Sequence, residues 1–360
     1  MRFQLTDDQR ALRDGVRQLL ARRFDGAALR AAVEAPALDR ALWRELGEAG
    51  FFALRLPEAD GGVGLGLPET VLAFEEAGRA LLPGPLIATH LAAGVVPGAA
   101  TGEAVVAAVD GGLVEWLAEA DVVRGEAAGA VPLRSVDPLT PLHRVAVIAS
   151  PPGSGTTSPP GSVIASRPDS GTTSPPDSGT TSPPDSGTTS PPGSVSASRP
   201  DSGTVSPPGP VTTSPPDPVI TGAPDPVAVL LTAAEQLGTA TRACELAVEH
   251  ARAREQFGQP IGGFQAVKHL CADMLVRVET ARAAVYAAAV TADPADIAAA
   301  RLLADEAAVR GARDCLQVHG GMGFTWECEV HLHLKRAWVR AQRGGGGTES
   351  EELLAADLTA

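Results

Sequence analysis

The segment Arg254-Glu-Gln-Phe-Gly-Gln-Pro-Ile-Gly-Gly-Phe-Gln265 lies between two long helical patterns. A second segment, Gln317-Val-His-Gly-Gly-Met-Gly-Phe-Thr-Trp-Glu327, begins about fifty residues later, at the end of another helical pattern. An arginine at a helix end can donate paired hydrogen bonds to phosphate. Consecutive glycines let backbone N–H groups approach a ligand with no Cβ in the way. The glycine run alone is equally typical of a turn, so the pairing of the two segments is what indicates a binding site.

The residues around these segments predict a helical bundle over 227–342. Apolar residues recur there at steps of three and four, which places them on one face of each helix. In the second helix of the bundle this face consists of Phe264, Val267, Cys271, Met274, Val278, Ala281 and Val285. A third helix is expected from Pro294 to Gln317 with Gly320-Gly321 at its end, and a fourth from Trp326 to Val339.

The first 100 residues also predict helices, starting after Thr6 and covering about 38–49 and 68–82. The glycine-rich run 60–66 is interpreted as a turn, because it lacks the preceding strand of a phosphate-binding loop. Residues 101–150 predict a small β-region, with β-branched strands at 104–109 and 144–149. The expected fold class is therefore mainly α with a small β-region.

Residues 151–226 are a low-complexity segment rich in Pro, Ser, Thr and Gly. Pro175-Pro-Asp-Ser-Gly-Thr-Thr-Ser182 recurs at once at 183–190. With almost no large apolar side chains, such a segment does not offset the entropy of ordering, so we expect disorder. A glycine-led tail at 343–360 closes the chain.

The two opening segments resemble the cofactor-binding half of the acyl-CoA dehydrogenase family, in a short actinobacterial-type form with a reduced middle β-domain. Leu56-Pro-Glu-Ala-Asp-Gly-Gly62 agrees with that family more loosely. The resemblance implies an N-terminal helical domain, a reduced β-domain and a C-terminal four-helix bundle. It also implies an FAD enzyme that oxidises an acyl-CoA thioester at its α and β carbons and passes electrons to an electron-transfer flavoprotein. Whether the acyl chain is a fatty acid or a sterol side chain stays open.

In this family FAD lies between the subunits of an oligomer. By match to the family's motifs, the residues expected to contact FAD are Arg254, Gln256, Phe257, Phe264 and Gln265. The residues expected to hold the ADP end of FAD in a neighbouring subunit are Gln317, Gly320 and Gly321. No residue is assigned to a metal.

The catalytic glutamate of the family has no obvious counterpart. Its commoner location matches Arg343-Gly-Gly-Gly-Gly-Thr348, and its other location matches Ala228. Glu235 lies seven residues after Ala228 on the same helical face and is the leading candidate base. The glutamates of the tail are lesser candidates. Three hypotheses follow: a base-lacking subunit of a hetero-oligomer, a flavin-free structural homologue, and an autonomous dehydrogenase that uses Glu235.

Charge and composition exclude other classes of protein. Lys and Arg number 29 against 43 Asp and Glu, a net charge of −14, which disfavours nucleic-acid binding. The four cysteines have no metal-ligand spacing, and the free thiols fit a reducing cytoplasm. The charged first ten residues are unlike a signal peptide, and no run is long enough to span a membrane. We therefore expect a cytoplasmic protein.

Overall fold

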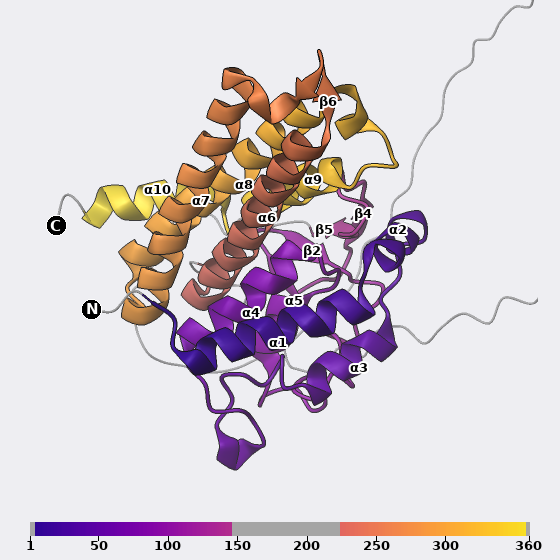
Figure 1. Ribbon diagram of the computed structural model, residues 1–360. Coiled ribbons are helices and arrows are strands. Elements are labelled where there is room, and N and C mark those ends of the chain that lie inside the picture. Colours follow the sequence, from indigo (N-terminus) through magenta and orange to yellow (C-terminus); the bar gives the residue numbers. More distant parts are fainter. Residues whose placement is uncertain (1–3, 146–223, 358–360) are drawn as a thin grey trace, which may run out of the picture. The chain divides into compact units, whose positions relative to one another are not determined.

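The computed structural model describes residues 4–145 and 224–357 (Figure 1). The Pro/Ser/Thr/Gly repeats that the sequence predicts to be disordered lie outside the described residues. The described parts comprise N-terminal helices, a small sheet, and a set of long C-terminal helices that run beside one another in Figure 1. The expected fold class, mainly α with a small β-region, is confirmed.

Five helices form the N-terminal part: α1 (Asp7–Arg23), α2 (Gly26–Glu34), α3 (Arg40–Glu48), α4 (Leu67–Arg79) and α5 (Leu86–Ala92). Thr6 starts α1 through a capping box with Gln9, and aspartates cap α2 and α3. The sequence did not predict α2 and α5, which are short. The glycine-rich run follows a 3-10 turn at Glu58–Asp60 and is a loop, as expected.

The β-region is a five-stranded sheet in the order β3-β1-β2-β5-β4. Its strands are β1 (Val106–Asp110), β2 (Leu113–Glu115), β3 (Val122–Arg124), β4 (Val131–Leu133) and β5 (Leu142–Arg144). Only β1 and β3 pair in parallel; the other neighbours are antiparallel. The strand expected at 104–109 matches β1. The strand expected at 144–149 overlaps β5 only at Arg144, and its residues beyond 145 lie outside the described residues.

The bundle contains α6 (Pro226–Ala253), α7 (Gln265–Thr291), α8 (Pro294–His319) and α9 (Val330–Ala341). Asp225 and Asp293 cap α6 and α8, and each is followed by a proline in the first turn, where its missing N–H costs nothing. The helix predicted from Trp326 instead begins at Val330, because the chain first makes a 3-10 turn, η3 (Gly320–Phe324). The expected tail contains a further helix, α10 (Gly346–Asp357).

One hydrophobic core joins the N-terminal helices to the bundle, with α4 packed along α6. A buried polar cluster crosses the same junction. Glu75 of α4 accepts a hydrogen bond from the Tyr286 hydroxyl at 2.6 Å and is ion-paired with Arg282, both from α7. Because each partner satisfies the other's charge or hydrogen-bonding group, this cluster orients α4 against the bundle that carries the candidate site.

Candidate cofactor face and catalytic positions

The first predicted cofactor segment forms a hairpin at the end of α6. Arg254 caps the C-terminus of that helix, directly after its last residue, Ala253, and strands β6 (Glu255–Gln256) and β7 (Gln259–Pro260) follow it. The two turn residues, Phe257 and Gly258, have φ of 52° and 79°, as a tight hairpin turn requires. A phenylalanine at positive φ is uncommon, and Phe257 is 91% exposed. The hairpin therefore presents an aromatic ring to the outside at a conformational cost.

The second predicted segment lies at the end of α8. Gly320 has φ of 61°, and a Cβ added at Gly320 or Gly321 would meet nothing within 4 Å, so both backbones face open space. Gln317 is exposed one turn earlier. The apolar side chains that follow are also exposed, namely Met322, Phe324 and Trp326. This end of α8 thus offers bare backbone beside an apolar surface.

The structure brings the two segments together through a pair of histidines. The ring of His250, in the last turn of α6, stacks on the ring of His319 with 4.0 Å between centroids. Phe264 packs edge-on against Phe257 at 6.0 Å within the hairpin region. Neither histidine is among the residues that the sequence predicts to contact FAD, and the two rings come from different helices, α6 and α8.

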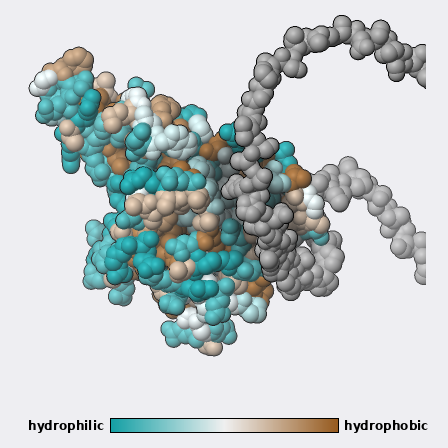
Figure 2. Space-filling model, turned by 90° about the vertical axis from the view of Figure 1, so that its right-hand side faces the viewer, coloured by the Kyte–Doolittle hydropathy of each residue, from teal (hydrophilic) through white to brown (hydrophobic). Residues whose placement is uncertain are grey.

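The residues on this face fit the chemistry of FAD. Within the described parts of the chain, the Arg254 guanidinium and the Gln317 amide have no hydrogen-bond partner, so both remain available to a ligand. A free guanidinium suits a pyrophosphate, and an exposed phenyl ring suits an aromatic ring system. Gln265 contacts His269 at 3.0 Å, and Gln256 bonds the carbonyl of Glu255. In Figure 2 the uppermost part of the molecule, where Figure 1 places this hairpin, mixes hydrophobic and hydrophilic residues.

The glycine run 344–347, which matches the commoner base location of the family, begins close to the start of α6, the helix that carries the other location, Ala228. A Cβ added at Gly344 would be 3.8 Å from Val229 Cγ2 and 3.9 Å from Pro224 Cβ, beside the first turn of α6 that holds Ala228. The backbone N–H of Gly344 donates to Asp110 of β1 at 2.9 Å. Neither Ala228 nor a glycine of the run has a carboxylate of its own, although the Glu349 carboxylate lies against Gly345 and that of Asp110 ties the run to the sheet.

Glu235 lies in the interior of the fold. Its side chain is 7% exposed and pairs with Arg340 of α9 at 2.9 Å. Burial raises the pKa of Glu235, while the Arg340 charge opposes that change. The sequence offered either a base or a solvated helical glutamate, and the observed environment is a third one, a buried ion pair. Among the tail glutamates, Glu351 and Glu352 are exposed on α10.

Arg340 belongs to a stripe of three arginines spaced along one side of α9 and just beyond it. Arg336 pairs with Asp137 in the loop before β5, and Arg343 pairs with Asp110 and Glu115 of β1 and β2. With Arg340 on Glu235, each arginine thus meets an acid from a different part of the fold. The stripe joins the small β-region to the bundle at the place where a base would be expected.

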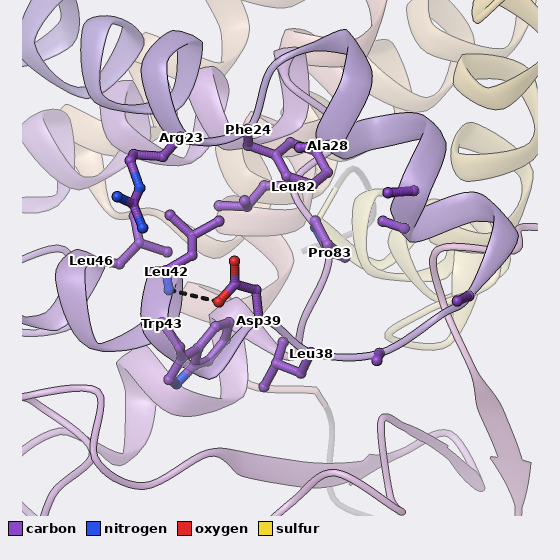
Figure 3. A pocket seen from close by; sticks show the side chains of 14 residues that line it. Arg23, Phe24, Ala28, Leu38, Asp39, Leu42, Trp43, Leu46, Leu82 and Pro83 are labelled. Atoms are coloured by element: carbon purple, nitrogen blue, oxygen red, sulfur yellow. Dashed lines mark hydrogen bonds between the residues drawn. The ribbon is translucent and has the colours of Figure 1, made fainter.

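A cavity of about 400 Å³ lies elsewhere, among α1, α2, α3 and the chain after α4 (Figure 3). Its lining is mostly apolar, with Arg23 and Asp39 as the charged members. Figure 3 shows the Asp39 carboxylate accepting the N–H of Leu42 as a helix cap, and Arg23 pairs with Glu45 at 3.0 Å. Both charges are engaged, so this cavity offers no group for chemistry.

Comparison with known proteins decides the family. The sequence models of the acyl-CoA dehydrogenase N-terminal and C-terminal domains match residues 6–104 and 228–355. The chain is 34% identical to acyl-CoA dehydrogenase IpdE2 of Mycobacterium tuberculosis over 93% of this chain and 92% of that protein. The chain belongs to the acyl-CoA dehydrogenase family.

Solved structures share the fold of this chain. The ChsE4-ChsE5 complex from Mycobacterium tuberculosis superposes with a TM-score of 0.70 at 21% identity, covering 100% of this chain and 99% of the other. The FAD complex of PigA gives 0.67 at 17% identity, covering 100% and 99%. The acyl-CoA dehydrogenase family, to which the chain belongs, is a family of oxidoreductases. Within the described ranges, no helix combines the length and apolar character that crossing a bilayer requires.

Proposed function

We propose that this acyl-CoA dehydrogenase family chain is a subunit that binds FAD, and that a second, paralogous subunit supplies the base for proton abstraction. The observation that carries this proposal is the contrast between two places in the fold. The cofactor face keeps Arg254, Phe257 and the glycines of η3 open to a ligand, whereas neither Ala228 nor the glycine run 344–347 carries a carboxylate of its own. A chain with this cofactor face but without a carboxylate at the base positions can complete a flavin site but needs a base from another subunit.

In the proposed site FAD supplies the hydride-accepting ring for oxidation of an acyl-CoA thioester. The Arg254 guanidinium binds the pyrophosphate, and the Phe257 ring lies against an aromatic ring of the cofactor. Gln256, Phe264 and Gln265 line the same hairpin face. Gln317 and the N–H groups of Gly320 and Gly321 hold the ADP end.

A partner subunit is required because these residues form an outer face and not a closed pocket. The exposed apolar side chains Met322, Phe324 and Trp326 flank that face, as residues covered by another chain do. The structural neighbour ChsE4-ChsE5 is itself a complex of two chains. An electron-transfer flavoprotein as acceptor and a cytoplasmic location remain predictions from the family resemblance and the sequence.

Co-expression with a full-length paralogue that carries the family glutamate tests this function. We expect a yellow hetero-oligomer whose flavin absorbance is lost when this chain is omitted, and whose turnover of acyl-CoA depends on the paralogue's glutamate. A flavin-loaded, active oligomer of this chain alone would overturn the proposal. A colourless complex would favour the flavin-free structural role.

A second candidate is an autonomous dehydrogenase with Glu235 as base. Burial raises the pKa of this carboxyl, which is the direction expected of a general base. Its ion pair with Arg340 opposes the idea, because a base must turn away from that partner to reach a substrate. Under this candidate, Glu235→Gln abolishes turnover by the isolated chain while the flavin stays bound; unchanged turnover excludes it.

A further inference from the structure

The His250–His319 contact is the one described ring contact that joins the two cofactor segments. The rings are nearly parallel, with 22° between their planes. His250 lies four residues before Arg254, and His319 immediately precedes Gly320. Any change in this contact therefore acts on the ends of α6 and α8, which carry the two segments.

The two rings are held differently. Nδ1 of His319 lies 2.9 Å from the carbonyl oxygen of Cys315, which only accepts, so this nitrogen carries the hydrogen. His319 is thus oriented by its own helix. The ring of His250 has no hydrogen bond within the described residues, so its position depends on the stack.

The groups around the stack make a positive charge unfavourable there. Burial lowers the pKa of His250, and His319, which faces it from α8, and Arg254, which follows on the chain, lower it further. Cys315 lies under His319, with its sulfur 3.7 Å from the ring. Glu249, which precedes His250 on α6, pairs with Arg242 at 3.3 Å.

We propose that His250 and His319 form a proton-sensitive clasp, which holds the hairpin and the η3 glycines together while the His250 ring is neutral and loosens them as that ring gains a proton. A stack without charge is stable, whereas an imidazolium at His250 is repelled by the Arg254 guanidinium. Because the folded pKa of His250 is depressed, the stabilisation is complete above about pH 6.5 and is lost as pH falls below it. The consequence for flavin retention rests on the proposed function; the clasp itself does not.

Hydrogen–deuterium exchange of the full chain in its complex tests the clasp. After correction for intrinsic exchange, we expect peptides covering 250–264 and 317–327 to exchange several-fold faster at pH 5.5 than at pH 7.5. Because each protonation is linked to the opening of the clasp, one titrating group can change the exchange rate by at most about tenfold per pH unit. His250→Phe keeps an aromatic ring in the stack and removes its charge, so the difference should vanish; His250→Tyr gives the same test if the first variant folds poorly.

His269→Gln is the matched control, because it removes an imidazole from α7 outside the stack and should leave the pH effect unchanged. The clasp is refuted if both stack variants keep the wild-type pH dependence, or if the wild type shows none. Flavin release, followed by FAD fluorescence, should accelerate between the same pH values in the wild type only. A complex without flavin at either pH contradicts the proposed function, while the exchange data still decide the clasp.

Discussion

Gly78 of α4 and Gly238 of α6 form a reciprocal contact between the N-terminal helices and the bundle. A Cβ added at Gly78 would lie 2.1 Å from the carbonyl oxygen of Glu235, and one added at Gly238 would lie 1.9 Å from that of Glu75. Each glycine thus opens space for the backbone three residues before the other. This close approach sets the α4–α6 distance and, with it, the place of Glu75 and Glu235 in the interior.

Gly238→Ala should therefore destabilise the fold by ~1–3 kcal/mol or more, because a methyl group forced against backbone moves whole helices apart. Urea unfolding of the purified chain measures the change. Gly15→Ala in α1 is the control, since nothing lies within 4 Å of a Cβ there. That substitution should be neutral or stabilise by up to about 1 kcal/mol. Equal effects at the two sites would contradict the packing argument.

Glu235→Leu should destabilise the chain by ~3–5 kcal/mol, because it leaves the buried Arg340 guanidinium without its counter-charge. The double variant Glu235→Leu/Arg340→Met should recover most of that loss, since both charges are then gone and the volume is kept. A double-mutant cycle of unfolding free energies gives the coupling. Simple additivity of the two single changes would show that the pair does not interact as the structure indicates.

His90 predicts a specific loss of stability in acid. Burial, with the nearby charge of Arg55, lowers its pKa to about 4, whereas in the unfolded chain it titrates near 6.5. The unfolded state therefore binds the proton first, and stability falls by roughly 3 kcal/mol as pH drops from 6.5 to 4. Unfolding of the wild type and His90→Met at pH 7.5 and pH 4.5 isolates this contribution. A pH dependence that is the same in both proteins would rule it out.

Arg254→Ala should weaken flavin retention by the complex at least about tenfold, the cost of a lost charge-assisted bond to phosphate. Flavin retention by Arg254→Lys should lie between that of the wild type and that of Arg254→Ala, because lysine keeps the charge without the paired donors. Equilibrium dialysis followed by flavin absorbance measures the effect. Arg252→Ala removes an exposed charge from the same helix end and should retain flavin; equal losses in both alanine variants would indicate a general electrostatic effect.

The local features of this fold were predictable because they depend on neighbouring residues. Asp225 with Pro226 starts α6, Asp293 with Pro294 starts α8, and Gly320 ends α8, all from capping rules. The Ala-rich α2 and the glycine-led α10 were not predicted, since they lack a clear apolar repeat. Their formation depends on packing against other elements.

By itself, the sequence determined the helical bundle, the two cofactor segments and the absence of an acid at Ala228 and in the 344–347 run. These features are contiguous, so their order along the chain suffices to reveal them. Only the tertiary structure decided that Gly344 lies beside the first turn of α6, that Glu235 faces Arg340, and that His250 meets His319. Each of these contacts joins residues far apart in the chain, and the distance between them is set by how helices pack.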